Sequence, residues 1–318
     1  MRTRLFACIV NIGLALHGLP VHALDAAAGE PALASRVAPP EQEVVDRFVA
    51  AGMRDARPHA LTPTERLRVG KALESLPALH RLVLEKRLRR LGFVDGIPGH
   101  GSGLFSPVAG TGQFDITLRA SLLGESLGDF LTTKERRLFA PDESGLVLTV
   151  DGTGTDALTY VLLHETSHAV DRALGLTADR RSPFVDGVWA DRATLVPSLA
   201  SSPAAGTAFR GGEPVPMGKA SDVYDALAHT PFVSLYATAA APEDFAELVA
   251  WHVISTVHGG SLAITLRNGQ GVAVSRYEPL AAPAARARIA HVEALLRRAD
   301  TEKGRDALQR LLDPTGGS

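Results

Sequence analysis

The chain has very little cysteine: Cys8 is the only one among 318 residues. A single cysteine forms no internal disulfide and no thiolate zinc site, so any metal must be held by histidine and carboxylate side chains. The sequence also has no G-x-S-x-G elbow and no phosphate-binding loop, which leaves serine hydrolases and nucleotide enzymes without support. The formal net charge of −2 gives no reason to expect nucleic acid or an anionic membrane as a partner.

The N-terminal residues have the pattern of a secretory leader. A basic start at Met1–Arg4 precedes an apolar run over Leu5–Leu19, and small residues lead to Ala23. We expect a signal peptide over 1–23, because the run is too short and interrupted for a membrane-spanning helix. Acylation at Cys8 is the weaker alternative, since most of the apolar run follows that residue. The protein is therefore expected to be exported, to a bacterial periplasm or outside the cell, with no stable membrane insertion after cleavage.

The pattern of elements predicts an α+β fold. Residues 24–40, rich in alanine and proline, are expected to be a linker. Residues 41–112 are expected to form a mainly helical region that ends in a glycine- and proline-rich loop over 92–112. Residues 113–318 mix helices and strands around a long irregular stretch at 177–228, and are expected to form the functional domain. The expected helices are 41–53, 62–76, 79–91, 132–139, 155–174, 243–257 and 284–312, and the expected strands are 114–119, 145–151, 262–266 and 272–275.

The stretch that carries chemistry is His164-Glu165-Thr166-Ser167-His168, an H-E-x-x-H string. Its surroundings have helical spacing, with Thr155 or Asp156 as a cap and Gly175 as the end. Four residues advance about 40° beyond one helical turn, so both imidazoles leave one face and can bind one metal ion. Zinc suits such a site because it takes nitrogen and oxygen ligands and keeps one position for water. Glu165 lies close enough to take a proton from that water.

A buried amphipathic helix with two incidental histidines is the alternative interpretation of this string. The preceding residues favour the metal site, because a strand at 145–151 and a glycine-containing loop at 152–154 lead directly into the helix. Strand, short loop and metal-binding helix make a coherent unit.

Two histidines leave a catalytic zinc one protein ligand short. The pattern H-E-x-x-H-x-x-G-x-x-H is excluded, because Asp171 and Leu174 stand where it needs glycine and histidine. Asp171 is about 10 Å along the helix from His164, so it is expected to contact a ligand side chain or to cap the helix. Glu243 and Glu247 share a helical face, so one carboxylate can bind zinc while the other accepts a ring N–H of a histidine ligand. The alternative for this pair is an acidic first turn favoured by the helix dipole.

Two further residues have weaker patterns. His229 lies shortly before Tyr236, and it is either a contact for a transition state or an ordinary loop histidine. Trp189, inside the irregular stretch, is either a packing residue or a wall of a substrate cleft.

The order of these motifs resembles the gluzincin metallopeptidases, and especially the catalytic domain of anthrax lethal factor and its bacterial relatives. The likeness consists of the H-E-x-x-H helix and of Tyr236, which lies seven residues before a helix that begins Glu243-Asp244-Phe245-Ala246-Glu247. It covers residues 155–175 and 232–254.

The resemblance implies a zincin-like domain, in which an active-site helix lies beside a small sheet, and one catalytic zinc ion. It also implies a role for each matching residue: metal binding for His164, His168 and Glu243, general base for Glu165, oxyanion stabilisation for Tyr236 and support of a histidine ligand for Glu247.

We therefore expect a secreted or periplasmic zinc endopeptidase acting on a peptide or protein substrate. Two alternatives stay open. In the first, the zincin fold and the zinc are present, but the protein binds an envelope partner or a peptide without cleaving it. In the second, the histidines and the acidic helix never meet.

Overall fold

The structure is a computed structural model that describes residues 33–99 and 101–313. Helices and strands are mixed throughout these ranges, so the predicted α+β class is confirmed. The expected signal peptide, residues 1–23, lies outside the described residues. None of the helices in the described ranges is both long and apolar enough to cross a membrane.

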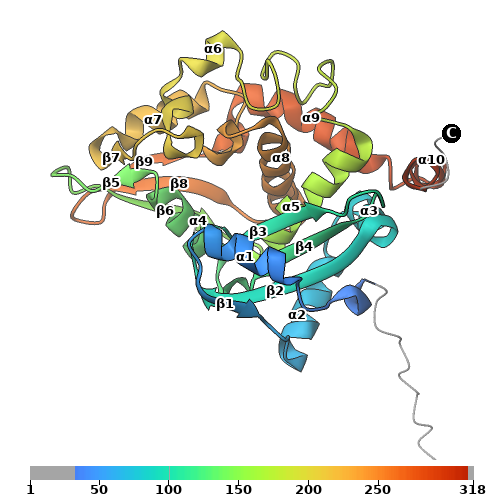
Figure 1. Ribbon diagram of the computed structural model, residues 1–318. Coiled ribbons are helices and arrows are strands. Elements are labelled where there is room, and N and C mark those ends of the chain that lie inside the picture. The colour runs from blue at the N-terminus through green and yellow to red at the C-terminus, as the bar shows by residue number, and fades with distance from the viewer. Residues whose placement is uncertain (1–32, 100, 314–318) are drawn as a thin grey trace, which may run out of the picture.

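The larger sheet of the described chain has the strand order β1-β2-β4-β3. The central strands β2 (Leu88–Ile97) and β4 (Phe114–Arg119) run parallel, while β1 (Arg54–Pro58) and β3 (Gly103–Pro107) flank them antiparallel. β4 is buried along most of its length, as a central strand requires. β3 is an edge strand and packs against α5 (Ala157–Leu174) (Figure 1).

The prediction of a loop over 92–112 is wrong, because most of this segment belongs to β2 and β3. Its glycines allow close backbone packing. A side chain at Gly103, for example, would collide with the carboxyl group of Glu165 on α5. The sheet also continues across the expected domain boundary, since β3 pairs with β4 on the other side of residue 112. Residues 41–112 therefore contribute three strands to a sheet shared with β4, in addition to the expected helices.

The helices expected before this sheet are present, with shifted ends. α1 (Gln42–Ala50) and α2 (Pro63–Glu74) match the predictions, and Thr62 with Glu65 forms the capping box of α2. α3 (Ala78–Arg87) ends earlier than predicted, because the chain continues directly into β2.

The described end of the expected linker is built into the fold. Leu33 is buried. Arg36 donates hydrogen bonds to the carbonyl oxygens of Leu84 (2.9 Å) and Glu85 (2.7 Å) near the end of α3. The carbonyl of Glu85 lies in the last turn of α3, where helix carbonyl groups lack partners within the helix, and that of Leu84 also accepts from the backbone N–H of Leu88. The linker expected over 24–40 therefore ends earlier than predicted. Its alanine and proline content does not reveal these contacts.

The second sheet has three strands in the order β6-β8-β9. β6 (Val147–Gly152) pairs antiparallel with β8 (Leu262–Arg267), and β8 forms the predicted hairpin with β9 (Ala273–Tyr277). α4 (Leu127–Arg136) packs on β6 and begins earlier than predicted, because Ser126 caps it. The stretch expected to be irregular contains short elements: α6 (Pro197–Ala200), β7 (Val215–Pro216) and α7 (Ala220–Ala228). The other elements of the described chain include β5 (Phe139–Ala140), α9 (Pro283–Arg297) and α10 (Glu302–Leu312).

α5 and α8 (Ala241–Thr256) pack against each other at the centre of the molecule (Figure 1). The first turn of α8 is fixed by the fully buried Asp244, whose carboxylate accepts two hydrogen bonds from Arg288 of α9 at 2.7 and 2.8 Å. The indole Nε1 of Trp189 donates to the same carboxylate at 2.9 Å. Trp189 is therefore a packing residue, and these contacts hold one end of α8 in position against α5.

Candidate metal centre

The H-E-x-x-H string lies on α5, as predicted. The carboxylate of Asp156 caps the helix by accepting from the backbone N–H of Thr159 at 2.9 Å, and Gly175 ends it in the left-handed conformation with φ 65°. His164 and His168 therefore leave one face of a continuous helix. Most of the remaining faces are buried, which fixes the rotation of the helix about its axis.

The acidic pair lies at the start of α8. Pro242 occupies the first turn, where its missing N–H leaves no hydrogen bond unmade, and Glu243 follows it. Because α5 and α8 pack together, Glu243 faces the two histidines although it is 79 residues from His164 in the sequence.

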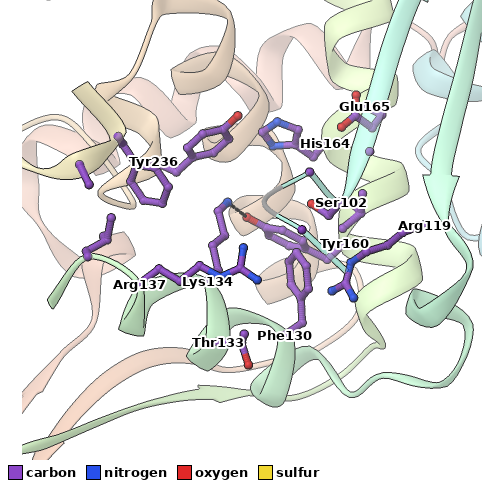
Figure 2. A pocket seen from close by; sticks show the side chains of 17 residues that line it. Ser102, Arg119, Phe130, Thr133, Lys134, Arg137, Tyr160, His164, Glu165 and Tyr236 are labelled. Atoms are coloured by element: carbon purple, nitrogen blue, oxygen red, sulfur yellow. Dashed lines mark hydrogen bonds between the residues drawn. The ribbon is translucent and has the colours of Figure 1, made fainter. Parts of the chain in front are cut away.

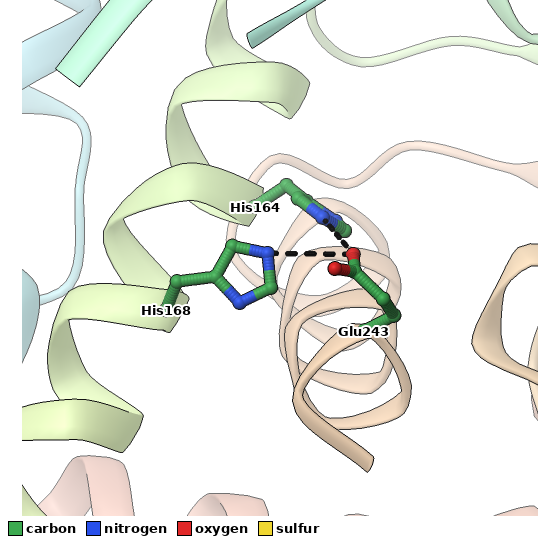
Figure 3. A group of neighbouring side chains, drawn as sticks. All are labelled: His164, His168 and Glu243. Carbon is green, nitrogen blue, oxygen red and sulfur yellow. Dashed lines mark hydrogen bonds and ion pairs between the residues drawn. The ribbon is translucent and has the colours of Figure 1, made fainter. Parts of the chain in front are cut away.

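Three donor atoms converge between the two helices (Figure 3). Oε2 of Glu243 lies 3.0 Å from Nε2 of His164 and 3.4 Å from Nε2 of His168. The ligand atoms of the three residues all lie within 4.8 Å of one another. Zinc bonds of about 2.0–2.1 Å in a tetrahedral arrangement separate neighbouring ligand atoms by about 3.3 Å. The donor types, and the distances from Glu243 to the two histidines, therefore fit one zinc ion.

The electrostatics of the site also favour a cation. Burial alone would lower the pKa of the His164 imidazole, yet the hydrogen bond to the carboxylate of Glu243 and the adjacent carboxylate of Glu247 raise it to about 10. Burial opposes ionisation of Glu243, but hydrogen bonds from His164 and His168 outweigh it and hold the pKa of this carboxyl well below its ordinary value. The carboxylates of Glu243 and Glu247 are thus both held in their charged form on either side of His164.

Glu247 lies one turn further along α8 and contacts the other side of His164. Its Oε1 is 3.0 Å from Nδ1 of His164, at an angle too oblique for a regular hydrogen bond. This position orients the imidazole so that Nε2 faces Glu243. Glu247 is almost completely buried. Burial opposes its ionisation, but Lys134, His164 and Ser234 outweigh that effect and hold the pKa of the carboxyl below its ordinary value.

Most of the groups that surround Glu247 could not be predicted from the sequence. Tyr160 donates to its Oε1 at 2.5 Å and Lys134 to the same atom at 3.2 Å, while Ser234 donates to Oε2 at 2.6 Å. Lys134 is 113 residues from Glu247 and lies on α4, so no spacing rule connects them. Tyr160 could have been predicted to lie near the site, since it is one turn before His164 on the same face of α5.

Glu165 is buried on α5 beside β3. Burial raises the pKa of its carboxyl, partly opposed by the neighbouring His168 and His164. A raised pKa suits a group that takes and returns a proton near neutral pH. The absence of a side chain at Gly103 leaves the space that this carboxyl occupies.

Tyr236 begins a short 3-10 helix that leads into α8. Its ring centroid lies 5.7 Å from that of His164, and the ammonium group of Lys134 is 4.0 Å from the centroid of the phenol ring. Burial, and then the nearby Glu243, raises the pKa of Tyr236 well above its ordinary value. The phenol therefore keeps its proton and can donate a hydrogen bond beside the donor cluster.

Two candidates from the sequence lie outside the donor cluster. The carboxylate of Asp171 accepts from the backbone N–H of Thr177 at 2.7 Å and from its hydroxyl at 2.6 Å. Those bonds hold the end of α5, so Asp171 has the capping role that was one of its two predicted roles. Within the described residues, no hydrogen bond joins Asp171 to the three candidate ligands. His229 is exposed, and its ring bonds to the backbone oxygen of Asp225 at 2.7 Å, as in an ordinary loop histidine.

Two cavities meet at the cluster. One, of about 390 Å³, extends along the edge strand β3 and is lined by Phe105 and His168, whose ring centroids are 6.4 Å apart. The other, of about 440 Å³, extends toward α4 (Figure 2). Both are lined by His164, Glu165 and Tyr236. The cluster is therefore open to a ligand on both sides.

No family model, curated protein sequence or solved structure matches the chain.

Proposed function

We propose that the protein is a zinc-dependent peptidase. The observation that carries this proposal is the convergence of His164, His168 and Glu243 with Glu165 beside them, at the meeting point of two cavities. The donor set and the short distances from Glu243 to both histidines support a single zinc ion. The same arrangement supports a zincin-like fold and the likeness to gluzincins. The leader expected over residues 1–23 favours activity in a periplasm or outside the cell.

When bound between these three residues, zinc would lower the pKa of a water molecule and polarise the peptide carbonyl. Glu165 takes the proton of the attacking water and passes it to the leaving amine. Tyr236, which retains its own proton, donates to the oxyanion that develops on the carbonyl. Glu247 holds His164 in the orientation that directs Nε2 toward Glu243.

The position of β3 favours a peptide as the substrate. β3 pairs with β4 on one side, and within the described residues no strand pairs with its other edge. The free backbone groups of an edge strand bind an extended peptide as an added strand. Gly103 at the start of β3 lines both cavities, so a peptide along this edge passes directly beside Glu165 and His164.

The variant Glu165→Gln tests the proposed reaction. We expect it to bind zinc as the parent does, and to cleave a mixed peptide library more slowly by roughly 100- to 10,000-fold, because the proton acceptor is lost. Cleavage is measured by mass spectrometry and zinc by elemental analysis. The exposed Glu143→Gln is the matched control and should behave as the parent. Near-parental turnover of Glu165→Gln would remove that residue from its role, and absence of cleavage by the zinc-loaded parent would contradict the peptidase proposal.

A further inference from the structure

The cavity on the α4 side of the metal centre has an unusual concentration of positive charge. Arg119 from the end of β4, and Lys134 and Arg137 from α4 and its C-terminal end, line it. Figure 2 shows the three cationic groups pointing into this space, while Glu165 lies at the opposite end near His164. Three side chains of one sign in a single cavity require an explanation, because like charges that face each other repel.

The carboxylates nearby neutralise only part of this charge. Arg119 pairs with Glu125 at 2.6 Å, and Lys134 pairs with Glu247 at 3.2 Å, although Glu247 also serves His164. In the described parts of the chain, no acidic side chain pairs with Arg137. Burial and the charge of Arg137 lower the pKa of Arg119, against the effect of Glu125, which places the two guanidinium groups in electrostatic range of each other. The cavity thus retains a positive excess centred on Arg137.

The walls of the cavity strengthen this charge. Aromatic rings of Phe130, Tyr160, Phe209 and Tyr236 line it, and the guanidinium carbon of Arg119 lies 5.5 Å from the Phe130 centroid. Apolar walls lower the local dielectric, so an anion within the cavity would interact more strongly with the largely buried Arg119 than it would in water, while the exposed Arg137 supplies the unpaired charge. Arginine also binds a carboxylate with two parallel hydrogen bonds.

We propose that this cavity binds a carboxylate of the peptide substrate, so that the enzyme selects an acidic group close to the bond that it cleaves. This inference rests on the proposed function and identifies its substrate class. The carboxylate has two possible sources, an internal aspartate or glutamate side chain or the C-terminus of the peptide. The unpaired charge of Arg137 disfavours a lysine or arginine side chain in the same cavity.

The test measures peptide binding to the full chain carrying Glu165→Gln and loaded with zinc, so that bound peptides stay intact. Fluorescent ten-residue peptides of alanine and serine carry one Glu, Gln or Lys, which is moved through every position, and have an amidated C-terminus. A further peptide without these residues has a free C-terminal carboxylate. Fluorescence anisotropy gives the affinities, and elemental analysis confirms the zinc content of every variant.

We expect the best Glu peptide to bind on the order of tenfold tighter than its Gln counterpart, as one charge-assisted hydrogen bond provides. Adding Arg137→Gln should abolish this preference, and Arg137→Glu should shift it toward the Lys peptide. The exposed Arg68→Gln changes the net charge equally and should leave the preference intact. Tighter binding of the free-carboxylate peptide alone would identify the C-terminus as the source.

Equal binding of the Glu, Gln and free-carboxylate peptides, a preference that survives Arg137→Gln, or no binding of any peptide would each overturn the inference. Cleavage by the zinc-loaded parent distinguishes this failure from that of the proposed function. Cleavage without a preference for acidic peptides would contradict the carboxylate cavity alone. Acid-selective binding without any cleavage would contradict the peptidase proposal and leave the cavity assignment standing.

Discussion

Glu247 shows how a single residue gives the candidate site its geometry. One oxygen of its carboxylate faces His164, Lys134 and Tyr160, and the other accepts from Ser234. A buried charge with this many partners is held in one place, and it holds His164 in turn. The charge, more than the shape of the side chain, makes the imidazole a better metal ligand.

We predict that Glu247→Gln weakens zinc binding by roughly 10–100-fold, the usual effect of losing a partner of a histidine ligand. The substitution keeps the size of the side chain and removes its charge. Zinc affinity is measured by competition with a chelator of known affinity. The control is Trp251→Phe, which removes a hydrogen bond of 3.3 Å to the same carboxylate and leaves the charge. Parental zinc affinity in Glu247→Gln would show that this carboxylate does not support the metal site.

The candidate ligands follow from spacing within single helices, and this is why the sequence predicts them. His164 and His168 are four apart, as are Glu243 and Glu247, and each pair shares one helical face. Lys134 has no such relation to any of them. Its position depends on the packing of α4, which the linear sequence does not encode in a readable pattern.

At the scale of elements, helices are easier to predict than the strands of the larger sheet. α5 has a cap, a periodic apolar pattern and a terminal glycine, and all three agree. β2 and β3 contain glycines that suggest a loop, but Gly103 is needed because the carboxyl group of Glu165 lies against it. A requirement imposed by a neighbouring helix is invisible until the fold is known.

α3 packs on α5 through a buried histidine that offers a test of this part of the fold. His80 is completely buried, and its Nε2 lies 3.0 Å from the hydroxyl of Ser167, which itself donates to the carbonyl of Leu163. His80 is therefore the donor to Ser167 in its neutral form. Burial lowers the pKa of His80 from 6.5 to about 3.

We predict that His80 makes the protein less stable in mild acid. Below its unfolded pKa of about 6.5 the imidazole takes up a proton only when the chain unfolds. Stability is therefore complete above that pH and falls by about 1.4 kcal/mol per unit as the pH drops toward 3. Urea unfolding at pH 7.5 and 5.0 should show about 2 kcal/mol less acid destabilisation in His80→Gln than in the parent.

Comparing the variant with the parent cancels the titration of all other groups. His229→Gln, which alters an exposed histidine, is the control and should lose stability as the parent does. If His80→Gln and the parent lose the same free energy of unfolding between the two pH values, His80 is not buried in its neutral form.

At the scale of the whole molecule, α5 and α8 bring together segments that are far apart in the sequence. His164 and Glu243 are 79 residues apart, and the chain between them includes α6, α7 and the packing residue Trp189. Arg288 of α9 fixes the start of α8 through its hydrogen bonds to Asp244. The candidate metal site is thus a product of global packing, and a zinc ion bound there would stabilise the contact between the two helices.

Zinc content is the most direct test of the metal site. The parent chain, Glu243→Ala and the exposed control Glu74→Ala are purified identically, reconstituted with zinc and analysed for metal per chain. We predict one zinc in the parent and in Glu74→Ala, and loss or strong weakening of zinc binding in Glu243→Ala. A parent without zinc after reconstitution, or equal zinc in Glu243→Ala, would contradict a site shared by α5 and α8.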